Sequence, residues 1–123
     1  MKIKYFLLVL MFSSIFLSSC GKDDDSCDAT YNSNVRAIIE NSCAYAGCHA
    51  GAEASMWVSE SSKDYTNFAG MQANITDGSF VKRVLEQKNM PPDDFIPEGR
   101  PTELTAEEIE ILTCWQENNF PES

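Results

Sequence analysis

The sequence has few basic residues, no internal repeat and no run in which apolar and polar residues alternate. Nine lysines and arginines stand against 19 aspartates and glutamates, which gives a formal net charge of −10. This charge argues against nucleic acid binding, because the phosphates would be repelled. Without strand-like alternation, helical periodicity is the main structural signal. A C-x-x-C motif within a βαβ pattern is also absent, which argues against a thiol-redox enzyme.

The first nineteen residues have the features of a bacterial lipoprotein signal peptide. Lys2 and Lys4 give a cationic start, and the following apolar run, YFLLVLMFSSIFL, is too short to span a bilayer comfortably. The run leads into LSSC, which resembles a lipobox, so we expect cleavage before Cys20 and lipid on that cysteine. The alternative is an ordinary secreted protein that is cut elsewhere. Cleavage at Cys20 removes two basic residues, leaving 104 residues and a net charge of −12.

Residues 20–30 are expected to form a flexible acidic tether. The stretch GKDDDS contains no apolar residue, so it cannot contribute to a core. A lysine followed by acidic residues just after the lipidated cysteine also resembles an export signal of surface lipoproteins in some Gram-negative bacteria. We therefore expect an outer-membrane lipoprotein of the cell envelope, on its periplasmic or surface face, with one small folded domain at residues 31–121.

Four segments have helical signals, so the expected fold class is all-α, with three to four short helices and long loops. The segments are residues 32–42, 64–75, 79–89 and 104–119. Their apolar faces comprise Val35, Ile38 and Ile39; Tyr65, Phe68, Met71 and Ile75; Val81, Val84 and Leu85; and Ile109, Leu112 and Trp115. Asn32 or Ser33 is expected to cap the first helix and Ser79 the third, and Thr105 and Glu108 form a capping box on the last. Helices this short make a thin core, which a bulky cofactor would fill.

Two cysteines and the only histidine fall within seven residues of the stretch SCAYAGCHAG, residues 42–51. Covalent haem attachment needs two thiols for the two vinyl groups and a histidine directly after the second cysteine to ligate the iron. Cys48 and His49 satisfy this rule, but Cys43 lies five positions before Cys48, where the ordinary C-x-x-C-H signal has three. Small residues between them, including Gly47, would let the backbone bulge. The motif predicts one haem c on Cys43 and Cys48 with His49 as proximal ligand, and leaves open whether both thiols bond it.

A second axial ligand must come from elsewhere in the chain. There is no second histidine, so bis-histidine ligation within one chain is excluded. Methionine is the expected alternative, and it raises the reduction potential relative to histidine. Met71 lies on an apolar helical face and is expected in the core, and Met56 is expected to be an ordinary loop residue. Met90 heads a Met-Pro-Pro sequence that would stiffen its loop, so we expect Met90 as the distal ligand.

The cysteine count predicts a disulfide between the two ends of the folded domain. Five cysteines remain after cleavage, and Cys20 is expected to carry lipid. If Cys43 and Cys48 bond haem, Cys27 and Cys114 remain as a pair. If Cys43 and Cys48 instead form a small disulfide loop, the same pair remains. Both solutions predict a Cys27–Cys114 disulfide that ties the two ends of the domain together in an oxidising compartment.

In the order of these features the chain resembles a small class I c-type cytochrome domain of exported bacterial lipoproteins. A first helix leads into CAYAGCH, DGSF opens a middle helix, MPP follows, and LTAEEIEIL with a later tryptophan ends the domain. The resemblance covers residues 31–121 and implies a cytochrome c-like fold, in which the first and last helices pack together beside the haem. It implies ligation by His49 and Met90. It also implies that the protein is a membrane-anchored electron carrier rather than an enzyme, passing single electrons to redox partner proteins at the cell envelope.

Other interpretations fit the residues less well. A zinc site would need Cys48 and His49, which are neighbours, to reach one tetrahedral ion together. A hydrolase would need one of the cysteines to pair with His49 as its base, and neighbours in sequence seldom form such a pair. The main alternative is a haem-free, disulfide-stapled lipoprotein domain that binds a protein partner. It explains the cysteines, but it explains neither the Met-Pro-Pro sequence nor the thin core.

Overall fold

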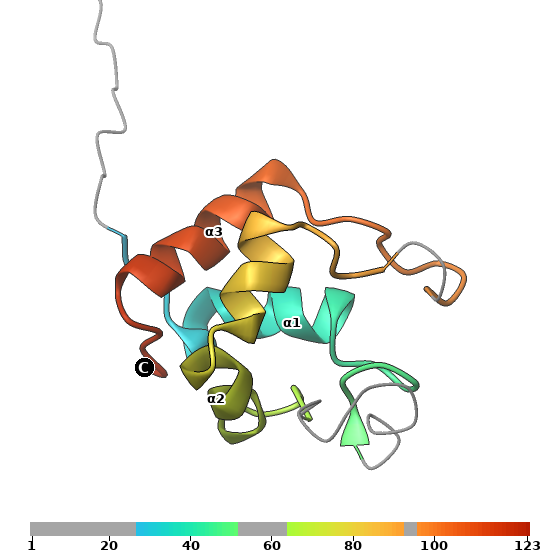
Figure 1. Ribbon diagram of the computed structural model, residues 1–123, viewed down its shortest axis with the longest axis horizontal. Coiled ribbons are helices and arrows are strands. Elements are labelled where there is room, and N and C mark those ends of the chain that lie inside the picture. The colour runs from blue at the N-terminus through green and yellow to red at the C-terminus, as the bar shows by residue number, and fades with distance from the viewer. Residues whose placement is uncertain (1–26, 52–63, 93–95) are drawn as a thin grey trace, which may run out of the picture.

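The computed structural model describes residues 27–51, 64–92 and 96–123, and every regular element in these ranges is helical. The elements are η1 (Tyr31–Val35), α1 (Arg36–Ser42), α2 (Phe68–Thr76), η3 (Val81–Glu86) and α3 (Ala106–Glu117). In Figure 1, α1 lies at the centre of the molecule, with α3 above it and α2 below it. The expected all-α class is confirmed for the described part of the chain. None of its helices has the length and hydropathy needed to cross a membrane.

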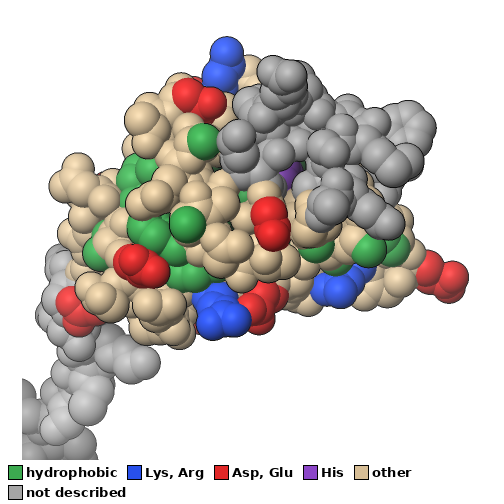
Figure 2. Space-filling model, turned by 90° about the horizontal axis from the view of Figure 1, so that it is seen from below, with side chains coloured by type: hydrophobic (Ala, Val, Ile, Leu, Met, Phe, Trp, Pro, Cys, Tyr) green, Lys and Arg blue, Asp and Glu red, His purple; other side chains and the backbone are tan. Residues whose placement is uncertain are grey.

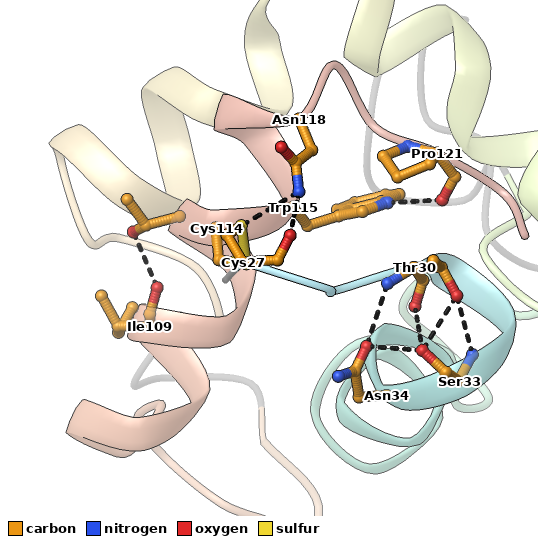
Figure 3. Close-up of a disulfide and its surroundings, with 10 residues drawn as sticks. Cys27, Thr30, Ser33, Asn34, Ile109, Cys114, Trp115, Asn118 and Pro121 are labelled. Atoms are coloured by element: carbon orange, nitrogen blue, oxygen red, sulfur yellow. Dashed lines mark hydrogen bonds between the residues drawn. A yellow bond between two sulfur atoms is a disulfide. The ribbon is translucent and has the colours of Figure 1, made fainter. Parts of the chain in front are cut away.

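The first helical segment begins with one π-helical stretch, η1, and continues directly into α1. Thr30 is its N-cap, with an extended backbone and a hydroxyl that accepts a hydrogen bond from the Ser33 N–H at 3.2 Å. The Thr30 N–H in turn donates to Asn34 Oδ1 at 3.1 Å (Figure 3). The expected caps, Asn32 and Ser33, are therefore wrong. Thr30 satisfies a free N–H of the first turn while Asn34 bonds back to it, as in a capping box.

The middle helices differ in how they begin, because α2 has a side-chain cap whereas η3 follows Phe80 without one. Asn67 caps α2 by accepting a hydrogen bond from the Gly70 N–H at 2.9 Å. The expectation that Ser79 caps the next helix is wrong, because its hydroxyl bonds back to the Asn74 carbonyl at 3.4 Å. Asp77 accepts from the Ser79 N–H at 2.8 Å instead, and the hydrogen bonds to Ser79 lower the pKa of the Asp77 carboxyl. A charged acceptor is thus placed just before the helix, where exposed N–H groups favour it.

The last helix, α3, begins as the sequence predicts. The Thr105 hydroxyl accepts from the Glu108 N–H at 3.2 Å, and the Glu108 carboxylate accepts from the Thr105 N–H at 2.8 Å. This confirmed capping box orients α3 so that Leu112 and Trp115 are fully buried. Trp115 is the centre of an aromatic cluster, with the Phe120 ring 4.9 Å away and the Phe80 ring 5.9 Å away.

The apolar faces of the described helices pack together in a single core. Its fully buried hydrophobic side chains are Val35, Ile39, Met71, Leu112 and Trp115. Met71 is therefore a core residue, as predicted. Met56 lies outside the described residues, as do Cys20 and the rest of the expected signal peptide and most of the tether.

The two ends of the domain are held together by a disulfide and by main-chain hydrogen bonds. Cys27 and Cys114 are bonded, and 87 positions separate them in the sequence (Figure 3). The Asn118 side chain donates to the Cys27 carbonyl, and the Trp115 indole N–H donates to the Pro121 carbonyl at 2.9 Å. The Tyr31 N–H also donates to the Pro121 carbonyl, at 2.9 Å. These bonds fasten the C-terminal segment to η1, against which α3 packs.

Candidate functional site

The site begins where α1 ends, in the loop Cys43–His49. Cys43 follows the last residue of α1, and its N–H donates to the Ile39 carbonyl at 2.8 Å. Its own carbonyl then accepts from the N–H groups of Tyr45, at 3.2 Å, and of His49, at 3.1 Å. Gly47 has a φ of +86°, which favours glycine. The four residues between the cysteines are thus folded into a compact turn that brings His49 back to the end of α1.

Both cysteines of this loop carry free thiols. Cys43 is buried and belongs to the core cluster, whereas Cys48 is half-buried. Burial raises the pKa of the Cys43 thiol to about 12, and the neighbouring Cys48 adds to the shift. The structure therefore bonds Cys27 to Cys114 and leaves two free thiols in the loop before His49. The alternative of a small Cys43–Cys48 disulfide loop is therefore absent from the structure.

The imidazole of His49 is held by Tyr65, which lies just before α2. The two rings stack in parallel, with centroids 4.0 Å apart and 7° between their planes. The Tyr65 N–H also donates to the His49 carbonyl at 2.8 Å. Tyr65 is only 5% exposed, and burial raises the pKa of its hydroxyl, with Cys43 as the next cause. Stacking uses the face of the imidazole, whereas a metal binds a ring nitrogen in the ring plane, so this contact orients the ring without blocking ligation.

A second tyrosine, Tyr45, lies against the other thiol. Its side chain is 6% exposed, its hydroxyl is hydrogen-bonded to Cys48, and burial raises its pKa to about 12. The guanidinium of Arg100 lies over the Tyr45 ring, 4.9 Å from its centroid. Arg100 also donates to the last carbonyls of α1, to Asn41 at 3.1 Å and to Glu40 at 3.4 Å.

Met90 lies in the segment that follows η3. Its side chain is half-buried against the core, while Pro91 is buried. Arg100, ten positions later in the chain, contacts Asn41 near the end of α1 and Tyr45 in the Cys43–His49 loop. The structure thus brings together the two cysteines, the histidine and two tyrosines, whereas Met90 lies half-buried against the core.

Sequence reasoning found the cysteines and His49 but missed three residues that hold them. Tyr45 has a weak signal, since it lies between the two cysteines. Tyr65 was assigned to the apolar face of a helix, but it lies before α2 and faces His49. Arg100 carries no signal at all, because its partners are 55 or more positions earlier in the chain.

The surroundings of the site add two observations. Among the described residues, no group of three or more His, Cys, Asp and Glu side chains is arranged to hold a metal ion. On the face shown in Figure 2, basic as well as acidic side chains are visible between apolar ones. This face therefore carries both positive and negative side chains and is not a purely acidic surface.

The chain matches no protein-family model, no curated protein and no solved structure. Its function must therefore be argued from the chemistry of the site itself.

The raised pKa of Cys43 predicts a loss of stability in alkali for the haem-free chain. Below pH 9.0, the ordinary value for the thiol, folded and unfolded chains both keep this proton. Above it the unfolded chain releases the proton and the folded chain does not, so stability falls until the pH reaches about 12. Each pH unit in this window costs ~1.4 kcal/mol for one proton.

The measurement is urea unfolding at about pH 8 and about pH 10.5, with Cys43→Ala as the matched variant. Wild type should lose ~2 kcal/mol more than Cys43→Ala between these two values. Equal losses in both chains would show that the Cys43 thiol is not held in its neutral form by burial.

Proposed function

We propose that this protein is an electron-transfer c-type cytochrome that carries one haem. Cys43 and Cys48 would bond the haem, His49 would be the proximal ligand of the iron, and Met90 the distal ligand. One observation carries the proposal: Cys27 and Cys114 are bonded to each other, while two thiols remain free beside an oriented imidazole.

The donor set fits the requirements of a covalent haem. Thioether bonds need free thiols, and both cysteines of the loop have them. The compact turn places His49 against Cys43 through a main-chain hydrogen bond of 3.1 Å, even though four residues separate the cysteines. Stacking on Tyr65 fixes the plane of the imidazole before any ligand binds. When bound, the haem would supply reversible one-electron chemistry at its iron.

Met71 and Met90, the two candidate distal ligands among the described residues, differ in how deeply they are buried. Met71 has no exposed surface and packs within the core, so its sulfur reaches nothing outside the core without repacking. Met90 is half-buried at the edge of the core, next to prolines that restrict its backbone. This supports Met90 as the distal ligand. With both axial positions taken by the protein, the iron would transfer electrons and bind no substrate.

A cytochrome c-like arrangement is part of the same proposal. The chain order supports it: a first helix runs into the Cys43–His49 loop, and the capped last helix packs against the beginning of that first helix. The expected lipid on Cys20 would place the domain at the outer membrane, where its partners would be redox proteins of the cell envelope. The negative net charge suits a basic partner surface.

The proposal is tested by an absorbance spectrum of the purified protein and by haem staining after denaturing electrophoresis. The host must have working cytochrome maturation. We expect a haem spectrum and stain that survives denaturation in wild type, loss of covalent haem in the Cys43→Ser/Cys48→Ser double variant, and retention in Ser42→Ala, which alters the buried residue before the loop. The single variants show whether one thiol suffices. Colourless wild-type protein would overturn the proposal and favour a haem-free, partner-binding domain.

A further inference from the structure

Arg100 contacts two neighbouring parts of the chain, the end of α1 and Tyr45, that lie 55 to 60 positions before it in the sequence. Its guanidinium lies 4.9 Å from the centre of the Tyr45 ring. The same group donates to the carbonyl of Asn41 at 3.1 Å and to that of Glu40 at 3.4 Å. These are among the last carbonyls of α1, which have no partner within the helix. One side chain thus covers the end of α1 and the face of Tyr45 at once.

Tyr45 connects Arg100 to the Cys48 thiol. Its hydroxyl is hydrogen-bonded to Cys48, and its ring is almost fully buried under Arg100 and the loop. The Cys48 N–H donates to the Tyr45 carbonyl at 3.0 Å, so main chain and side chain of Tyr45 both hold Cys48. A movement of the Tyr45 ring would therefore displace Cys48.

Arg100 does not form an ion pair with the neighbouring acid. The Glu40 carboxylate lies 2.7 Å from the Arg36 side chain, and the contact of Arg100 with Glu40 is to the main chain. The positive charge of Arg100 is thus directed to carbonyl oxygens and to an aromatic face. Both favour a cation, the carbonyls through the negative end of the helix dipole and the ring through its quadrupole.

We propose that Arg100 is a positioning residue for haem attachment, which holds Tyr45 over the Cys43–His49 loop and so fixes the Cys48 thiol. The role of Arg100 in haem attachment rests on the proposed function, but the contact of Arg100 with Tyr45 does not depend on a haem. A planar guanidinium stacks on a ring and donates in its own plane at the same time, which a lysine ammonium does not do. Arg100→Lys should therefore behave like Arg100→Gln in weakening the position of Cys48.

The test measures how fast iodoacetamide alkylates each free thiol of the full chain made without haem. Cys43 and Cys48 are read separately by peptide mass spectrometry. In Arg100→Gln, and in Tyr45→Phe, which removes the hydroxyl bonded to Cys48, we expect Cys48 to react about fivefold faster, the factor that corresponds to ~1 kcal/mol. Arg83→Gln, which removes an exposed arginine of η3, should leave the rate unchanged.

The buried Cys43 thiol serves as an internal control for general loosening of the fold. If Cys48 alone reacts faster, Arg100 positions it. If both thiols accelerate equally, or if neither does, the proposal is overturned. The same variants made with cytochrome maturation should show a smaller fraction of protein with two thioether bonds. A wild type that binds no covalent haem, with Cys48 still alkylated faster in Arg100→Gln than in wild type, is a separate outcome. That result would refute the proposed function but support the positioning role of Arg100.

Discussion

Replacing Met90 with alanine in the haem-loaded protein should lower its reduction potential and let carbon monoxide bind the reduced iron. A thioether ligand favours Fe(II), and its loss leaves one axial position to water or to an added ligand. Axial ligation sets haem potentials over a range of roughly 0.8 V, so the change should be a sizeable part of that range. A redox titration and carbon monoxide difference spectra measure the two effects.

Met71→Leu is the matched control for this experiment. Met71 is fully buried, and leucine conserves most of its volume, so the substitution should cost less than ~1.5 kcal/mol of stability. The potential and the carbon monoxide response should stay as in wild type. If Met90→Ala leaves both unchanged while Met71→Leu alters them, the distal ligand is Met71, and the core must rearrange around the haem.

Removing the Cys27–Cys114 disulfide should greatly lower the free energy of unfolding of the domain. The bond closes a loop that spans 87 positions, and a loop of this size restricts the unfolded chain by ~4 to 5 kcal/mol in the chain-entropy treatment. A domain this small has only ~5 to 15 kcal/mol of stability in total. We therefore expect the Cys27→Ala/Cys114→Ala variant to unfold at a much lower urea concentration.

Thr113→Ala provides the control on the same helix. Thr113 precedes Cys114, and its hydroxyl donates to the Ile109 carbonyl of its own helix at 2.7 Å. Its loss should change the free energy of unfolding by about 0.5 kcal/mol or less. A double-alanine variant within ~1 kcal/mol of wild type would mean that the disulfide restricts an unfolded chain that is already compact.

Local sequence signals predicted the elements well where a short-range rule decides the structure. The capping box of Thr105 and Glu108, the burial of Leu112 and Trp115 and the core position of Met71 all follow from spacing within one helix. The expected caps of the first and third helices were wrong, because Thr30 caps η1 and η3 follows Phe80 without a side-chain cap. Several polar residues near each of these starts offer similar hydrogen bonds, and only the packed chain shows that Thr30 and Asp77 make them.

By itself the sequence determined the all-α class, the Cys43, Cys48 and His49 motif, and the pairing of Cys27 with Cys114. Each of these depends on residues close together in the chain or on a count of cysteines. Only the tertiary structure decided how the wide spacing between the cysteines is folded, and which side chains hold the loop. Tyr65 and Arg100 reach it from distant segments, through ring stacking and bonds to the end of α1. Such contacts depend on how the helices pack, and no local pattern in the sequence encodes them.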